Sequence, residues 1–286
     1  MHHDAAHSFD LPADLLRELR PGVIFPICFD ALLRMRQMLR MQDATPRQLA
    51  GAVLVDPLVC ARLLRRANRS RPATPITGIR NALMRVGAER TRRIASAVSG
   101  GQIDCARQLT HVDVLSHRLW LHTLRTAAGA FVIAQRLTSI DPDEAMTAGL
   151  LHDIGTFHLL DRLVRHPHAT LTLQAMIGRI LEWHEAIGES LLHSLGVPVV
   201  LIEAMRDHEQ PRVAPATLHT LSDVVFIANV LAGGATELYG DPVCHVSQRP
   251  DPVRERFAGL LPDIEQEFAA LRGVPVDHVP ADQRRP

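Results

Sequence analysis

The sequence contains no lysine, so all 31 of its basic residues are arginine. They balance 31 acidic residues, which leaves a formal net charge of +0. Overall charge therefore favours neither a nucleic-acid partner nor a membrane surface. An arginine-only composition is typical of a GC-rich genome, and selection for bidentate phosphate binding is the functional alternative.

Cysteines and long apolar runs are also scarce. The four cysteines form no C-x-x-C pair and are widely spread, which argues against a disulfide scaffold and favours a reducing compartment. The longest apolar runs, such as Val224–Ala232, are far shorter than the roughly 18 residues that a spanning helix needs. The N-terminal residues show no apolar signal core. We therefore expect a cytoplasmic protein that has no membrane partner.

Aromatic residues make up only 4% of the chain, whereas the hydrophobic fraction is 47%. The core must then consist mainly of Leu, Ala, Val and Ile, a composition that favours packed helices over sandwiches or barrels. Helix-start signals recur along the chain, as the capping box Thr45–Gln48 and as Asp-Pro at 56–57 and 141–142. No alternating run is bounded by hairpin turns. The sequence predicts an all-α fold.

The chain is predicted to divide into two contiguous helical subdomains, residues 10–100 and 101–235. The boundary is placed near residues 98–101, where Gly100 and Gly101 are expected to end a helix. Residues 236–286 form a C-terminal segment with a loop at 240–252 and a disordered end at 280–286. Between them we expect one amphipathic helix whose apolar face carries Val253, Phe257, Leu260, Ile264 and Phe268.

Histidines and aspartates occur in several helical stretches of the second subdomain, at His122, His152, Asp153, His184, His208 and Asp223. Imidazole and carboxylate groups are typical metal ligands, and helix packing could bring them into one cavity. Each also has a simpler interpretation. His122 could be a core histidine bonded to a carbonyl, His152-Asp153 a helix C-terminal cap, and Asp223 a helix N-cap. The histidines that match no motif are expected at the surface or as local caps; they are His158, His166, His168, His193 and His219.

Longer motifs accompany these residues in a fixed order. The first half contains Asp56-Pro57-Leu58, Arg62–Asn68, Ile76–Leu83 and Val86-Gly87. The second half contains Trp120-Leu121-His122, Ala148–Gly155, His184–Gly188 and Asp207-His208-Glu209. Over about residues 10 to 235, this series resembles the HDOD family, whose members mostly serve as signalling output modules. That family is a branch of the HD superfamily of metal-dependent phosphohydrolases.

The resemblance implies an HD-like helical bundle in the second subdomain, with a metal site. The order His…His-Asp…Asp resembles the HD ligand set, so His122, His152, Asp153 and Asp223 are the implied ligands. His184 and His208 resemble the pair that holds a second ion in the HD-GYP branch. A mixed imidazole and carboxylate site suits Fe, Mn, Zn, Ni or Co, and the sequence does not distinguish among them.

Two functions from different classes are compatible with these features. The first is a bacterial regulatory module that binds a signalling protein partner, or a small phosphate-containing ligand, without turnover. The second is a metal-dependent phosphohydrolase in which Asp153 binds metal and orients water, and Arg125, by spacing alone, offsets phosphoryl charge. The Gly-Tyr-Pro motif of cyclic-dinucleotide phosphodiesterases is absent after Glu209, which argues against that substrate.

A run of arginines marks the first subdomain. Residues 61–93 contain ten arginines, from Arg62 to Arg93, against the single acid Glu89, which gives 10 − 1 = +9. A solvated helical face is the simpler interpretation, and a phosphate-binding patch is the functional one. The run has no aromatic residue, so stacking on single-stranded nucleic acid is not expected, and a nucleic-acid partner is not predicted.

Overall fold

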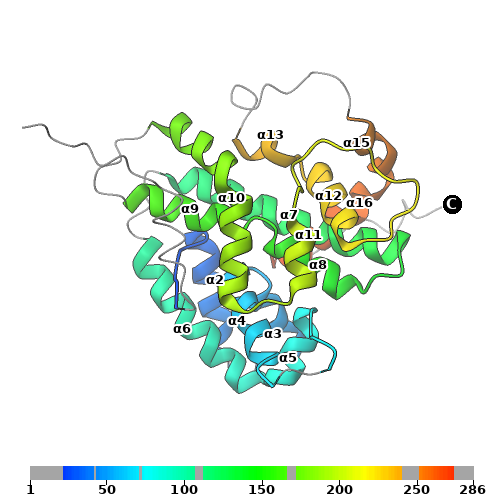
Figure 1. Cartoon of the computed structure of the whole chain (residues 1–286). Helices are drawn as coiled ribbons and strands as arrows, with labels where there is room; N and C mark the ends of the chain where they lie inside the picture. Colours follow the sequence, from blue (N-terminus) through cyan, green and yellow to red (C-terminus); the bar gives the residue numbers. More distant parts are fainter. Residues whose placement is uncertain are drawn as a thin grey trace, which may run out of the picture.

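The computed structural model describes residues 22–41, 43–70, 73–106, 112–165, 172–239 and 251–273, and every regular element in these ranges is helical (Figure 1). The prediction of an all-α fold is confirmed for this part of the chain. The first 21 residues, most of the loop predicted at 240–252 and the predicted disordered end lie outside the described residues. None of the described helices is long and apolar enough to cross a membrane.

Within residues 22–106 as described, the N-terminal helices are α2 (Phe29–Arg40), α3 (Pro46–Val53), α4 (Pro57–Ala67), α5 (Ile79–Val86) and α6 (Ala88–Ala106). The predicted caps are present. Thr45 Oγ1 accepts from Gln48 N at 3.2 Å while Gln48 Oε1 accepts from Thr45 N at 2.8 Å, which closes the capping box of α3. Asp56 caps α4 by accepting from the N–H groups of Leu58 and Val59.

Helix α6 continues through Gly100 and Gly101, so the predicted helix end at the subdomain boundary is wrong. The physical reason is close packing. A Cβ atom added at Gly101 would lie 2.6 Å from Ile24 Cδ1, in the segment that precedes α2. Glycine is thus present inside a helix because another chain segment approaches its backbone, and this requirement outweighs its low helix propensity.

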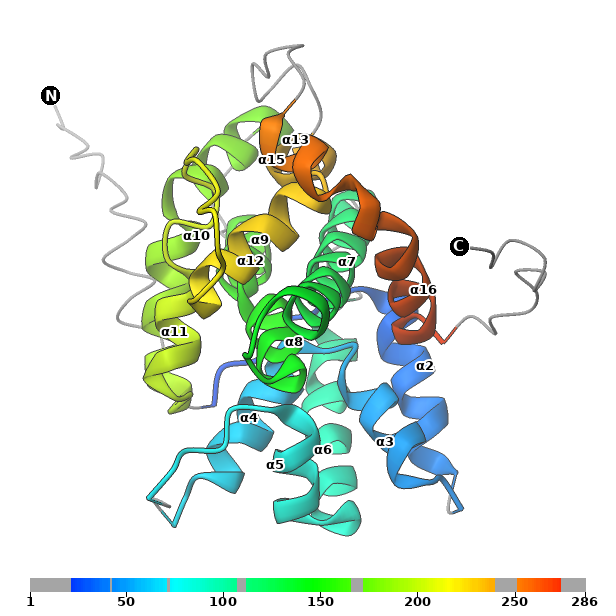
Figure 2. The same ribbon diagram turned by 90° about the vertical axis from the view of Figure 1, so that its right-hand side faces the viewer.

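The long helix α7 (Asp113–Leu137) lies in the middle of the molecule in Figure 2. It is followed by α8 (Pro142–Leu151), α9 (Ile154–Arg165), α10 (Leu173–Leu195), α11 (Val199–Met205), α12 (Leu221–Leu231) and α13 (Gly234–Tyr239). Hydrogen bonds join them to the N-terminal helices. Ile79 N donates to Thr147 Oγ1 at 3.1 Å, and Arg80 N donates to Asp143 Oδ2 at 2.9 Å. One continuous apolar core extends from Phe25 to Leu271, so the division into subdomains remains a prediction.

Within the described residues 251–273, the C-terminal segment packs on α7 and α12 as three short helices in place of the single helix expected. They are α15 (Pro252–Phe257), the 3-10 helix η2 (Ala258–Leu260) and α16 (Leu261–Leu271). Pro262 accounts for the break, because proline has no N–H to continue an α-helical bond from the preceding turn. The predicted apolar face is buried at Val253, Phe257, Ile264 and Phe268, whereas Leu260 is only partly buried.

Candidate metal centre

His122 belongs to the middle of α7 and is 2% exposed. Its Nε2 atom lies 3.3 Å from His152 Nε2 and 3.7 Å from Asp153 Oδ2. Two imidazoles and a carboxylate therefore meet between α7 and the end of α8, in a region from which water is excluded. Burying even a neutral polar group without a hydrogen bond costs roughly 2–7 kcal/mol, and an isolated charge costs more. The buried carboxylate of Asp153 therefore needs a partner of opposite charge.

His152 and Asp153 are adjacent in sequence, and both face this space because the chain turns between α8 and α9. Helix α8 ends at Leu151, and α9 begins at Ile154. Gly155 lets α9 approach α10, since a Cβ atom there would overlap the carbonyl oxygen of His184 and lie 2.6 Å from Gly188 N. Gly155, two residues after Asp153, therefore allows Asp153 to lie close to the helix that carries His184.

His184 on α10 and His208, just after α11, complete the cluster. Both side chains are buried, and their Nε2 atoms lie 3.9 Å and 3.5 Å from Asp153 Oδ1. Asp207, with a φ of 56°, turns the backbone into the left-handed region immediately before His208. Aspartate is among the residues that adopt this conformation most readily.

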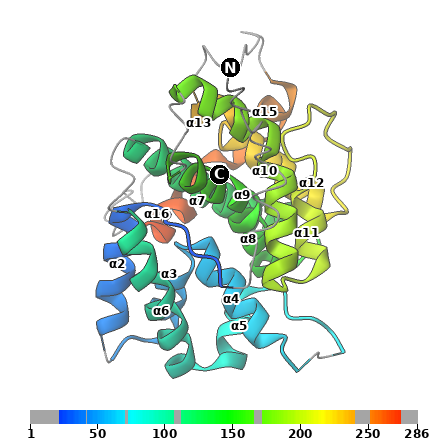
Figure 3. The same ribbon diagram turned by 60° about the vertical axis from the view of Figure 1, so that its left-hand side comes forward.

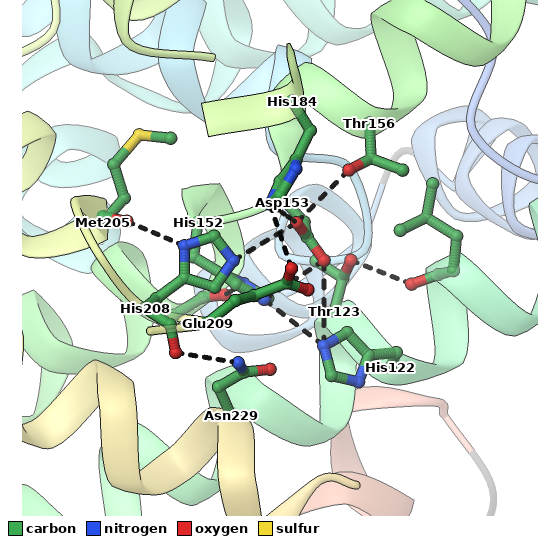
Figure 4. Close-up of polar contacts among 12 residues, drawn as sticks. His122, Thr123, His152, Asp153, Thr156, His184, Met205, His208, Glu209 and Asn229 are labelled. Carbon is green, nitrogen blue, oxygen red and sulfur yellow. Dashed lines mark hydrogen bonds and ion pairs between the residues drawn. The ribbon is translucent and has the colours of Figure 1, made fainter. Parts of the chain in front are cut away.

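Figure 4 shows Asp153 in the middle of four imidazoles. Its Oδ2 atom faces His122 and His152, and its Oδ1 atom faces His184 and His208. Two groups of potential ligands result, His122/His152/Asp153 and Asp153/His184/His208, and in each the ligand atoms lie within 4.8 Å of one another. We call these five residues the His/Asp cluster. Five of the six residues predicted as ligands thus lie together in the structure, and their binding of metal stays a prediction.

Hydrogen bonds to backbone carbonyls orient three of the four imidazoles. The Nδ1 atoms of His152, His184 and His208 lie 2.7, 3.0 and 2.7 Å from the carbonyl oxygens of Gly149, Ile180 and Met205. A carbonyl accepts only, so each Nδ1 carries hydrogen, and each neutral ring presents the lone pair of its Nε2 to the cluster. This is the usual orientation of metal-binding histidines.

Several atoms of the cluster have no hydrogen-bond partner among the described residues, namely Asp153 Oδ2, His184 Nε2 and His208 Nε2. Buried polar atoms are nearly always paired. Here a carboxylate oxygen and two imidazole nitrogens converge on the same space, and none of the three makes a hydrogen bond to a described residue. The set therefore fits a bound cation, with His122, His152 and Asp153 as the holders of one ion and Asp153, His184 and His208 of another.

The charges of the cluster are strongly shifted by burial and by each other. Burial and the neighbouring His152 lower the pKa of His122 to about 4. Burial alone would raise the pKa of Asp153, but His152 and His208 hold it well below its usual range. Burial would likewise lower the pKa of His208, yet Asp153 raises it to about 9. Asp153 thus favours the protonated form of His208, so an ion held at His208 Nε2 would have to displace that proton.

Asp223 does not join the cluster, and its prediction as a ligand is wrong. It is the third residue of α12, where Oδ2 accepts from Thr220 Oγ1 at 2.7 Å and Asp223 N donates back to Thr220 Oγ1 at 3.1 Å. Its Oδ1 lies 3.9 Å from an Arg212 nitrogen. The carboxylate belongs to a capping box, in which an acidic group also offsets the helix dipole.

Arg125 is also directed elsewhere, so the hypothesis from spacing that it serves the site is not supported. Its Nε lies 3.0 Å from Glu265 Oε1, and its guanidinium lies 4.6 Å from the ring centroid of Phe268. Both partners belong to α16. Arg125 therefore fastens the C-terminal helix to α7.

Three residues that border the cluster were not singled out from the sequence. Thr156 donates to Asp153 Oδ1 at 3.2 Å, and Glu209 Oε2 lies 3.7 Å from His184 Nε2. Asn229, buried on α12, donates to the carbonyl of His208 at 3.1 Å, and its own Oδ1 has no hydrogen-bond partner among the described residues. A sequence signal did exist for Asn229, because it is the one polar residue within the apolar run 224–232.

A cavity of about 900 Å³ opens next to the cluster. His208, Glu209 and Asn229 line it on the cluster side, and the walls are formed by the chain after α11, by α12 and α13, and by the start of α15. A volume in this range suits a small organic ligand. Burial raises the pKa of Glu209 above its usual value, so this side chain can carry a proton at the border between cluster and cavity.

Comparisons with known proteins agree with the architecture. A crystal structure of the MmoQ response regulator from Methylococcus capsulatus str. Bath is 22% identical, with a TM-score of 0.60, over 84% of this chain and 99% of that one. A fragment of MmoQ, residues 20–298, gives 22% identity and a TM-score of 0.54 over 86% and 90%. An HDOD domain protein with unknown function from Geobacter sulfurreducens gives 20% identity and a TM-score of 0.37 over 92% and 98%. The likeness to the two MmoQ structures shows the fold alone.

Comparison with curated proteins finds no relative of this sequence. The HDOD domain, in contrast, matches residues 25–211, which is more than half of the chain and includes every residue of the His/Asp cluster. The resemblance inferred from the motifs is confirmed, and the chain belongs to the HDOD family.

Proposed function

We propose that this protein is a regulatory HDOD module whose His/Asp cluster holds divalent transition-metal ions. Its output is the binding of a signalling protein or a small ligand. The observation that carries the proposal is the position of Asp153, whose two oxygens face two separate pairs of histidines. Asp153 could therefore help to hold an ion with either pair of histidines. Membership in the HDOD family supports the regulatory role.

The ligands of such a centre come from four separate parts of the fold. His122 is on α7, His152 and Asp153 join α8 to α9, His184 is on α10, and His208 follows α11. An ion held here would fasten these segments to one another, because ligands that are far apart in sequence link metal affinity to folding. Gain or loss of metal would then change the stability and the surface of the whole bundle, which is the property that a regulatory module needs.

A metal-dependent phosphohydrolase acting on a nucleotide or another phosphoester is the second candidate. The cavity of about 900 Å³ beside His208, Glu209 and Asn229 favours it, since a ligand there would reach the cluster directly. A bound metal would supply Lewis-acid activation of water and of the phosphoryl group. Glu209 would hold or release a proton at the cavity border, and Asn229 Oδ1 would accept a hydrogen bond from the ligand.

Metal analysis of the purified full-length protein tests both candidates. We expect bound metal in the wild type and its loss in Asp153→Asn. Asp223→Asn is the matched control, because Asp223 lies in the capping box of α12 and should leave metal content unchanged. Absence of metal after growth and refolding with each of Fe, Mn, Zn, Ni and Co would refute the metal-binding proposal.

A hydrolysis assay on the wild type, Asp153→Asn and Asp223→Asn distinguishes the regulatory module from the enzyme. Each is incubated with a panel of phosphomonoesters, phosphodiesters and nucleotides, and released phosphate is measured. Turnover that requires metal, disappears in Asp153→Asn and persists in Asp223→Asn would establish the phosphohydrolase. Metal-loaded protein that hydrolyses none of these substrates would support the regulatory module.

A further inference from the structure

Arginines gather around two adjoining hollows formed by α4, α5 and α6. The larger hollow, of about 510 Å³, is lined by Arg66, Arg69, Arg85 and Arg90 together with Ala67, Ser70 and Val86. A second hollow of about 300 Å³ shares Arg66 and Arg90 and adds Arg93 and Ile94. We call this feature the arginine pocket. It contains half of the basic run noted between Arg62 and Arg93.

Few acidic groups or carbonyls compensate this charge. Within the described residues, Arg85 donates to Ser70 Oγ at 3.2 Å, and Arg93 lies 3.6 Å from the exposed Glu89. No ion pair or side-chain hydrogen bond joins Arg66, Arg69 or Arg90 to any described residue. Arginines elsewhere are mostly paired or bonded to carbonyls, as at Arg62, Arg92, Arg136, Arg206 and Arg256.

Helix dipoles explain only part of this arrangement. Arg66 and Arg85 lie in the last turns of α4 and α5, where cations are favourable. Arg90, however, lies in the first turn of α6, the end at which a helix favours anions. Arg90 nevertheless lines the same hollow as Arg66 and Arg69, and an anion in the hollow would reduce the repulsion among the three. The unpaired N–H groups of that first turn would add to the attraction for an anion.

The arginine pocket is separate from the His/Asp cluster. In Figure 3, α5 and the adjoining ends of α4 and α6 lie at the lower end of the molecule, whereas α12, α13 and α15, which border the cavity beside the cluster, lie above. None of the residues that line the two hollows belongs to the cluster or to that cavity. A ligand here would thus be additional to any ligand of the metal centre.

The lining identifies the chemistry of the ligand. Each guanidinium group can donate two parallel hydrogen bonds to the oxygens of a phosphate. Several guanidinium groups around one hollow therefore suit a ligand with more than one phosphate. The volume is in the range of small-molecule sites. No aromatic side chain lines either hollow, so a base would find no stacking partner, and recognition would rest on the phosphates.

We propose that the arginine pocket binds the pyrophosphate group of a small molecule. Inorganic pyrophosphate and the diphosphate of a nucleotide share this group. Calorimetric titration of the full-length protein with pyrophosphate, ADP, AMP and adenosine, without magnesium and at about 0.15 M salt, tests it. We expect pyrophosphate and ADP to bind, AMP to bind more weakly, and adenosine not to bind. Equal affinities for pyrophosphate and ADP would indicate that the phosphates alone are read, and tighter binding of ADP would identify a nucleotide.

Four variants assign the binding to these residues. Arg66→Gln/Arg90→Gln should weaken pyrophosphate binding by about tenfold or more, because two charge-assisted contacts are lost. Arg66→Lys/Arg90→Lys keeps the charge but removes the forked donors, and we expect it to be weakened as well. Arg36→Gln/Arg40→Gln, on the exposed face of α2, removes equal charge elsewhere and should bind like the wild type. Asp153→Asn should also bind normally, which separates this result from the fate of the metal centre.

Three outcomes would overturn the proposal. The first is no pyrophosphate binding by the wild type at millimolar concentration. The second is an equal loss of affinity in the Arg36/Arg40 control, or unchanged affinity in the lysine variant, since either would indicate unspecific attraction of anions. The third is duplex DNA or an acidic peptide that displaces pyrophosphate and binds more tightly, because the surface would then serve a macromolecule. Thermal melts of all variants confirm that each is folded.

Discussion

His208 Nε2 lies 3.5 Å from Asp153 Oδ1, whereas His152 Nε2 lies 3.3 Å from Asp153 Oδ2. The two oxygens of one buried carboxylate are thus divided between histidines from different parts of the chain. The Nδ1 of His208 is hydrogen-bonded to the Met205 carbonyl, and Asp153 accepts a hydrogen bond from the hydroxyl of Thr156. The side chains are therefore oriented before any ion binds, which lowers the entropy cost of binding.

Chelation should destabilise the wild-type protein. Metal at about 100 times its dissociation constant adds about 2.7 kcal/mol to the folded state, which corresponds to roughly 5–10 °C in Tm for a chain of this size. We expect EDTA to reverse this gain in thermal melts of the wild type and to have no effect on Asp153→Asn. A wild-type melt that EDTA leaves unchanged, in protein shown to contain metal, would contradict the link between metal and stability.

His184→Gln should remove one ion and leave the other. His184 belongs only to the group Asp153/His184/His208, so metal analysis should fall from about two ions per chain to about one. His193→Gln, an exposed position on the same helix, is the control and should not change the ratio. If His184→Gln lost all metal, the two groups would have to be one site.

Gly155→Ala should weaken the contact between α9 and α10. The added Cβ would overlap the carbonyl oxygen of His184, a backbone atom that cannot rotate away. We expect a loss of about 1–3 kcal/mol or more in the free energy of unfolding, measured by denaturant titration. Gly178→Ala is the matched control, because its Cβ would meet no atom within 4 Å, and it should stabilise the protein by up to about 1 kcal/mol.

We expect the protein to lose stability in mild acid because of the buried His158. It is 1% exposed, contrary to the expected surface position, and neither ring nitrogen has a hydrogen-bond partner among the described residues. Burial lowers its pKa from 6.5 to about 4. As the pH falls below 6.5, His158 becomes protonated in the unfolded chain but stays neutral in the folded chain. The free energy of unfolding therefore decreases. Above pH 6.5 both states are neutral, and the contribution is constant.

This decrease should amount to about 2 kcal/mol between pH 7.5 and 5 for His158 alone. His158→Leu removes the titrating group while keeping an apolar contact with Phe25, whose ring centroid lies 5.6 Å from that of the imidazole. Urea titrations at both pH values should show a smaller acid loss in the variant. Equal losses in the two proteins would show that His158 is not the group responsible.

The order of the family motifs pointed to six ligands, of which His122, His152, Asp153, His184 and His208 lie together in the structure. Their binding of metal stays a prediction. Asp223 was misjudged, because a carboxylate on an apolar helix suggests a ligand, while the local Thr220 was overlooked as its capping partner. Asn229, two turns further along α12, is the residue that faces His208. Its signal in the sequence was its place as the one polar residue of the apolar run 224–232, which was not used.

Gly101 and Arg125 were misjudged for a related reason, since each is explained by a contact with a distant segment. Ile24 determines the need for glycine inside α6, and Glu265 determines the direction of the Arg125 side chain. Neither partner is near in sequence. Caps such as Asp56 and Thr45 were predicted well because their partners lie within three residues.

The C-terminal helices have a practical consequence for experiments on fragments. The HDOD match ends at residue 211, but α12 carries Asn229, and α16 covers α7 through Phe268, Ile264 and the Arg136–Asp263 pair at 2.8 Å. A fragment cut at the family boundary would expose this apolar side of α7 and lose the wall of the cavity beside His208. Exposed apolar patches promote aggregation. Insolubility or lack of ligand binding in such a fragment would therefore describe the truncation and not the native chain.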